Sequence, residues 1–141
     1  MAKMQNIAGA RFFVVQKDEV SPAYLEVRDA TPEEISAYRR DIVRAHEGNQ
    51  GVYLDKEHAA KSQLVQYGFV LSLVVAAHGF DVGTDAEQLL SWDTDRERVW
   101  GLVEPALKDL FRRTIISINM PDAPAEFENA AVIASRKRPN S

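Results

Sequence analysis

Apolar and polar residues alternate near the N-terminus in a way that is typical of two short strands. The segment 11–16 (RFFVVQ) is rich in the aromatic and β-branched residues that favour strands. After a Ser-Pro turn signal, Leu25 and Val27 face one way within 23–28 and the larger polar residues face the other. We therefore predict a β-hairpin from Arg11 to Arg28. A lone hairpin is marginal in water, so it must pack against other elements.

The pattern then changes from a period of two to a helical one. The Thr31 hydroxyl can cap a helix, Pro32 suits the first helical position, and Glu34 can reach back to the cap. Apolar residues follow at steps of three and four and form one face. They are Ile35, Tyr38 and Ile42. These signals predict a helix from about Pro32 to Glu47.

A second helix is predicted from Asp55, which is a good cap, to about His78, with Gly79 as its stop. Its second half, Leu64 to Ala77, is apolar on nearly every side. A helix of this kind is surrounded by other elements, so we predict that it is the buried centre of the fold. The apolar run is about fourteen residues long, and a membrane-spanning helix needs roughly twenty.

The C-terminal half is also predicted to be helical. Capping-box patterns open a short helix over 85–92 and a long one over 95–118. Pro105 should kink or split the long helix. A last short helix is predicted over 125–134.

These elements predict a mainly α fold in a single domain, residues 1–141. A small N-terminal β-hairpin precedes a compact bundle of four to five helices around the buried central helix. Both termini, 1–10 and 135–141, are predicted to be loose. The final segment is basic and rich in polar residues, which is typical of an unpacked end.

The composition narrows the functional classes. The 141-residue chain is 45% hydrophobic and carries a formal charge of −4, which disfavours non-specific binding to nucleic acid or to anionic membranes. It has no cysteine, which excludes disulfides, thiolate metal sites and cysteine nucleophiles. The N-terminal segment lacks the shape of a signal peptide, so a cytoplasmic location is expected.

No constellation of residues predicts catalysis. His46, His58 and His78 do not pair at the spacing of a helical metal site. The acidic residues between 81 and 97 fit helix caps and first turns better than a cation site. No serine lies in a nucleophile motif, and the glycines form no phosphate loop. We therefore predict a protein that is not an enzyme and needs no cofactor or metal.

A protein-binding surface is predicted on the β-hairpin and the exposed side of the first helix. The hairpin would offer free strand edges to an extended partner segment, and the nearby arginines would steer an acidic partner. The residues chosen are Phe12, Phe13, Tyr24, Arg28, Arg39, Arg40 and Arg44. The alternative, that the hairpin only covers the helical core, stays open.

The order of these segments resembles a known family. A hairpin ending in 25–28 (LEVR) leads to 30–35 (ATPEEI), which opens a charged helix. A long apolar helix then begins at 59–65 (AAKSQLV), and a further long helix follows a stretch containing Trp and Asp. Over roughly residues 11 to 120, the chain resembles the tail assembly chaperones of long-tailed bacteriophages.

The resemblance implies a small, mostly α-helical protein of the host cytoplasm. Such a protein binds the tape-measure protein and helps recruit tail-tube subunits, without catalysis or a cofactor and without entering the finished particle. Two other readings remain: a structural component of the phage particle, or a small helical adaptor or regulatory protein. Neither nucleic acid nor membrane is an expected partner, and a homo-oligomer is compatible with the sequence.

Overall fold

The computed structural model describes residues 11–17, 23–79, 92–120, 126–128 and 132–139. Within them, four helices and five strands form a mixed α/β fold, so the predicted mainly α fold with only a two-stranded hairpin is wrong. The elements are β1 (Arg11–Gln16), β2 (Tyr24–Arg28), α1 (Pro32–His46), α2 (Lys56–Leu73), β3 (Val74–His78), α3 (Trp92–Leu102), α4 (Pro105–Asn119), β4 (Glu126–Glu128) and β5 (Val132–Ser135).

The five strands form one antiparallel sheet in the order β3-β2-β1-β5-β4. The predicted hairpin is present, with Phe12 opposite Val27 and Val14 opposite Leu25. However, β1 also pairs with β5 and β2 also pairs with β3. The hairpin therefore has no free strand edge, and the predicted capture of an extended partner segment at such an edge is wrong.

The second predicted helix ends five residues early. α2 stops at Leu73, and residues 74–78 form β3 instead of helix. Val74 is opposite Val27 and His78 is opposite Tyr24. Residues 74–78 therefore pair with β2 in the sheet instead of continuing the helix. Its two leading valines favour this choice, because β-branched side chains suit a strand. Gly79, with a φ of 74°, then ends the strand.

The predicted C-terminal helix over 125–134 is also wrong. The described residues of that region form β4 and β5. In β5, Val132 and Ala134 are buried and alternate with half-buried residues, which is the period of a strand. Pairing with β1 keeps these two side chains on the core face of the sheet.

Three sequence predictions about the helices are confirmed. Thr31 and Glu34 form the capping box that starts α1, and Asp55 caps α2. Pro105 separates α3 from α4 and occupies the first turn of α4. The helix α3 already begins at Trp92, however, so Thr94 lies inside it and is not its cap. The predicted helix over 85–92 falls almost entirely outside the described residues.

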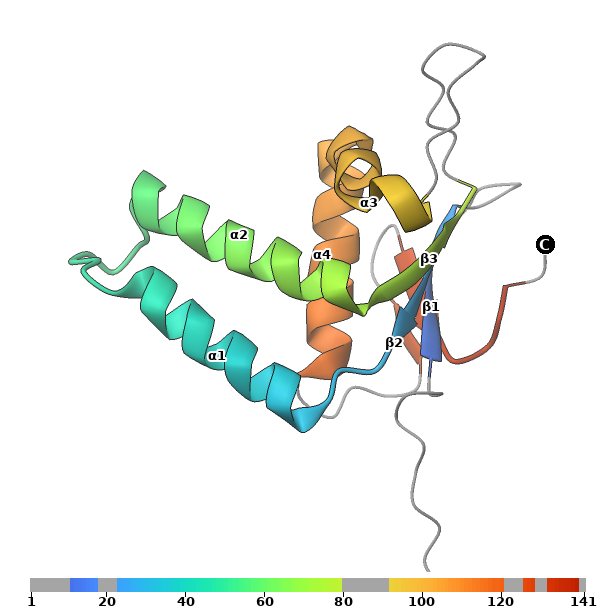
Figure 1. Ribbon diagram of the computed structural model, residues 1–141, viewed down its shortest axis with the longest axis horizontal. Helices are drawn as coiled ribbons and strands as arrows, with labels where there is room; N and C mark the ends of the chain where they lie inside the picture. Colours follow the sequence, from blue (N-terminus) through green and yellow to red (C-terminus); the bar gives the residue numbers. More distant parts are fainter. Residues whose placement is uncertain (1–10, 18–22, 80–91, 121–125, 129–131, 140–141) are drawn as a thin grey trace, which may run out of the picture.

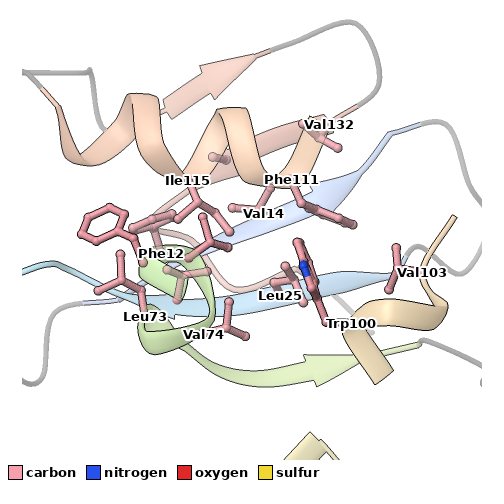
Figure 2. Packing of buried hydrophobic residues seen from close by; sticks show 14 of the residues in the cluster. Phe12, Val14, Leu25, Leu73, Val74, Trp100, Val103, Phe111, Ile115 and Val132 are labelled. Atoms are coloured by element: carbon pink, nitrogen blue, oxygen red, sulfur yellow. The ribbon is translucent and has the colours of Figure 1, made fainter. Parts of the chain in front are cut away.

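The core lies between one face of the sheet and the helices, chiefly α4 (Figure 1; Figure 2). Phe111 and Ile115 of α4 are fully buried against Val14, Leu25 and their neighbours on the strands. α2 contributes Leu73 and Val70 at its C-terminal end, so the core is centred on the sheet and α4.

α2 is not buried all round, contrary to the prediction. Leu64 is 73% exposed, and nothing lies within 4 Å of the Cβ position of Gly68. Its buried residues, Ser62, Phe69, Val70 and Leu73, occupy a single stripe. The helix pairs with α1 to form an antiparallel helical hairpin that extends away from the sheet (Figure 1).

Candidate functional site

The exposed side of α1 carries a group of arginines without acidic partners. Arg39, Arg40 and Arg44 are exposed, and none of them forms an ion pair with a residue that the structure describes. Arg40 and Arg44 are one helical turn apart, where like charges repel. Val43 is one helical turn from Arg39 and Arg40 and is 64% exposed. The side of α1 that faces away from α2 is therefore basic with an apolar centre.

Most of the exposed large hydrophobic residues lie on the same helical hairpin. Six such residues are found in the described part of the chain, and all but Leu102 of α3 belong to α1, α2 or the loop between them. Those five are Val43, Val52, Tyr53, Leu54 and Leu64. Val52 is 96% exposed and Tyr53 is 88% exposed, at the end of the hairpin that is farthest from the sheet (Figure 1).

The loop that carries Val52 and Tyr53 is held by specific hydrogen bonds. The Asn49 side-chain amide donates to the carbonyl oxygens of Gly51 and Tyr53, at 3.1 Å each. Its oxygen accepts a hydrogen bond of 3.0 Å from the backbone N–H of Asp55. The Asn49 amide thus ties both halves of the loop together, and the two apolar side chains are presented outward from this hydrogen-bonded backbone.

His58 joins the two helices at the base of this loop. Its Nδ1 lies 2.7 Å from the carboxylate of Asp55, and its Nε2 lies 2.8 Å from the carbonyl oxygen of Glu47 at the end of α1. Both partners are acceptors, so this geometry favours the protonated imidazole, in which both ring nitrogens donate. In agreement, the hydrogen bond with Asp55 raises the pKa of His58, and the hydrogen bonds from His58 lower the pKa of Asp55.

A groove runs between α1 and α2 beside this surface. Its volume is about 340 Å³. It is lined by Glu34, Ala37, Tyr38, Asp41, Leu64, Val65, Gly68, Phe69 and Ser72. The helical hairpin thus carries most of the exposed large hydrophobic residues in the described part of the chain. They lie near the basic side of α1 and near this groove.

Arg28 does not belong to this surface. Its two terminal nitrogens each lie 2.7 Å from a carboxylate oxygen of Glu34. This pair lowers the pKa of Glu34 to about 2. Arg28 is therefore committed to the start of α1, and about ten helical residues, or roughly 15 Å, separate it from Arg44. The structure does not bring the predicted arginines into one cluster.

The predicted aromatic residues lie on the sheet. Phe12 is 1% exposed and belongs to the core, while Phe13 is 6% exposed on the opposite face. Tyr24 meets Phe13 edge to face and stacks on His78, with a ring-centroid distance of 4.5 Å. Phe12 therefore offers no contact to a partner, and Phe13 and Tyr24 form a separate aromatic group.

The other histidines make structural contacts. His46 is 3.2 Å from the Ser62 hydroxyl and connects α1 to α2. His78 lies at the end of β3, not at a helix C-terminus as predicted.

No group of three or more metal-ligating side chains occurs among the described residues. In the same residues, no helix combines the length and the hydropathy that crossing a membrane requires.

Comparisons of the chain with protein-family models, with curated proteins and with solved structures find no match. The geometry of the described residues is therefore the basis for any functional conclusion.

The sequence prediction found the arginines of α1 but missed the apolar end of the hairpin. The signal was present: Val52, Tyr53 and Leu54 stand in a loop between two capped helices, where polar residues are usual. Leu64 also falls outside the spacing of the buried residues of α2, such as Ser62 and Phe69.

Proposed function

We propose that this protein acts by binding another protein and not by catalysis, through the exposed side of its helical hairpin. The hairpin surface consists of Arg39, Arg40, Val43, Arg44, Val52, Tyr53, Leu54 and Leu64. The observation that carries the proposal is the concentration of exposed large hydrophobic residues on one projecting element, next to arginines that form no ion pair with a described residue. Exposed apolar groups gathered in this way are typical of protein-interaction sites.

The partner has an acidic surface with apolar residues at its centre. The whole chain is acidic, with a formal charge of −4, so the basic charge on α1 is local. An acidic partner relieves the repulsion between Arg40 and Arg44 and is steered to this side of the molecule. Val43 and Tyr53 then supply the apolar contacts that slow its dissociation.

Within this class we propose a tail assembly chaperone that binds a tape-measure protein in the host cytoplasm and helps recruit tail-tube subunits. The segment 25–35, which carries the start of the resemblance, has the predicted strand, capping box and helix. The five-stranded sheet differs from the mostly helical fold that the resemblance implies. This difference weakens the support that the resemblance gives to the chaperone role. The hairpin surface supports a binding role for this protein independently of that resemblance.

Co-expression with a candidate tape-measure protein, followed by a quantitative pull-down, tests both the proposed binding surface and the proposed chaperone role. One variant, Arg40→Glu/Arg44→Glu, reverses the charge of the surface, and a second, Tyr53→Ser/Leu64→Ser, removes apolar contacts. Matched controls on α3 are Arg98→Glu, at an exposed arginine, and Leu102→Ser, at a residue that is 52% exposed. All four proteins should melt within a few degrees of the wild type, because surface changes rarely alter stability by more than about 0.5 kcal/mol.

We expect each hairpin variant to bind about tenfold more weakly or worse, which corresponds to about 1.4 kcal/mol, and each α3 control to bind like the wild type. Equal binding by the hairpin and α3 variants would show that the hairpin is not the docking surface. If the wild type binds neither the tape-measure protein nor the tail-tube protein, the chaperone role is wrong. Recovery of the protein from purified particles would instead assign it to the virion.

A further inference from the structure

The C-terminal segment 136–139, called the tail here, lies in the stretch that was predicted to be loose, and it contacts the rest of the fold. After β5 it passes round the end of the sheet and lies on the face opposite the helices (Figure 1). The turn is fixed by a hydrogen bond of 3.0 Å from the backbone N–H of Lys137 to the Ser135 hydroxyl. The tail is thus directed back over the outer face of the sheet.

Two arginines of the tail each meet one acidic residue and one aromatic ring. Arg136 lies 2.7 Å from the carboxylate of Asp29, and its guanidinium is 5.4 Å from the centre of the Phe12 ring. Arg138 lies 3.7 Å from the carboxylate of Glu26, and its guanidinium is 5.3 Å from the centre of the Phe13 ring. Among the described residues, Lys137 has no acidic or aromatic partner of this kind.

Glu26 is the unusual member of this group. It is 6% exposed, although it lies on the face of the sheet that the described helices do not cover. Glutamate is rarely so buried unless it is paired. One of its oxygens lies 3.6 Å from Nε2 of His78 and the other faces Arg138. Beside the carboxylate stand the rings of Phe13, Tyr24 and His78, which contact one another.

A carboxylate framed by aromatic rings suits a guanidinium group. The acid accepts charge-assisted hydrogen bonds, and the ring faces attract the planar cation. Lysine fits less well, because its ammonium is a compact, strongly hydrated charge. The chemistry of this site therefore selects arginine, in agreement with Arg138, the tail residue that occupies it.

Glu26 is well buried in this site, whereas Arg138, which occupies the site, is largely exposed. The Glu26 side chain is 8% exposed, whereas the Arg138 side chain is 62% exposed, and their separation of 3.7 Å exceeds hydrogen-bond distance. An arginine that comes within hydrogen-bond distance of the carboxylate would bind better.

We propose that Glu26, Phe13, Tyr24 and His78 form a binding site for an arginine on a basic segment of a partner protein, and that the chain's own tail fills this site when the partner is absent. The site lies on the sheet and takes a basic ligand, whereas the hairpin surface takes an acidic one. The two proposals therefore stand or fall separately.

The test uses the full chain and a fluorescent peptide that copies residues 135–141 (SRKRPNS). Binding is measured by anisotropy for the wild type, Arg138→Ala and the matched control Lys137→Ala, which removes the same charge one residue away. A tail that fills the site for nine-tenths of the time weakens the apparent affinity of a competing peptide about tenfold. We therefore expect Arg138→Ala to bind the peptide about tenfold more tightly than the wild type and Lys137→Ala do.

Two further measurements identify the site and its ligand. Adding Glu26→Gln to Arg138→Ala should abolish the tighter binding while the melting curve stays cooperative. A peptide with alanine in place of its second arginine should fail to bind, and one with alanine in place of its lysine should bind normally. Equal binding by Arg138→Ala and Lys137→Ala, or by the two altered peptides, would overturn the proposal. So would a wild-type dimer that Arg138→Ala dissociates, because the occupant would then be the tail of a second copy.

Discussion

The pair between Arg28 and Glu34 makes the start of α1 sensitive to acid. Both oxygens of Glu34 accept hydrogen bonds from Arg28, at 2.7 Å each, and one also accepts a bond of 3.0 Å from the backbone N–H of Thr31. The bond with Arg28 is the main reason that the pKa of Glu34 is lowered from 4.5 to about 2. We predict that Glu34→Gln, which keeps the shape and the acceptor of the cap, lowers the free energy of unfolding at pH 7.

The magnitude follows from this pKa. A depression from 4.5 to about 2 corresponds to about 3.4 kcal/mol at about 1.36 kcal/mol per pKa unit. The two side chains are 28% and 30% exposed, so solvent screens the pair and about 1–2 kcal/mol is the realistic effect. Because the folded-state pKa is depressed, the stabilisation is complete above pH 4.5 and is lost as the pH falls toward 2.

Urea unfolding followed by circular dichroism at several pH values between 7 and 2.5 measures this effect. The control is Glu33→Gln, because Glu33 is also in the first turn of α1 and is exposed. The difference between the wild type and Glu34→Gln should be about 1–2 kcal/mol at pH 7 and should shrink steadily below pH 4.5. If the two glutamine variants show the same stability at every pH, then the pair contributes nothing and the geometry of this cap is wrong.

Two further predictions concern the core and the loop of the helical hairpin. Leu73→Ala should lower the free energy of unfolding in urea by about 2–5 kcal/mol, because Leu73 is 0% exposed. Leu64→Ala in the same helix should lower it by less than about 0.5 kcal/mol. Equal costs would contradict the buried and exposed faces described for α2. The pKa of His58 is raised by Asp55, so its contribution is complete below pH 6.5 and is lost as the pH rises through the raised pKa. Amide exchange at Asn49 and Asp55, corrected for its intrinsic pH dependence, should therefore quicken across that range in the wild type and not in His58→Gln.

Local signals predicted the elements whose structure is decided locally. The start of α1 was readable because Thr31, Pro32 and Glu34 each satisfy a requirement of the first helical turn. The break between α3 and α4 was readable because Pro105 cannot donate the hydrogen bond that a continuous helix needs. The hairpin of β1 and β2 was readable from its alternation and its turn.

The rest of the sheet depends on partners that are distant in sequence. The apolar run that ends α2 continues into β3 without a helix-breaking residue, and only the edge of β2, about fifty residues earlier, makes residues 74–78 a strand. In the same way, β5 is too short to be recognised alone and is formed by pairing with β1. These two pairings also decide the candidate sites. They close the edges that were predicted to bind a partner, and they bring His78 and Arg138 to Glu26.

The core and the proposed binding surface lie in different parts of the fold, so we expect substitutions on that surface to leave stability nearly unchanged. The stabilising contacts are concentrated between the sheet and α4, where residues such as Phe111 and Ile115 are fully buried. The outward side of the helical hairpin contributes little to that core, so packing does not determine which residues stand there. Repulsion between like charges and apolar area exposed to water do not stabilise a fold. A protein selected only for stability would therefore not keep such residues. Their presence on a single projecting element is the observation that supports the proposed binding role.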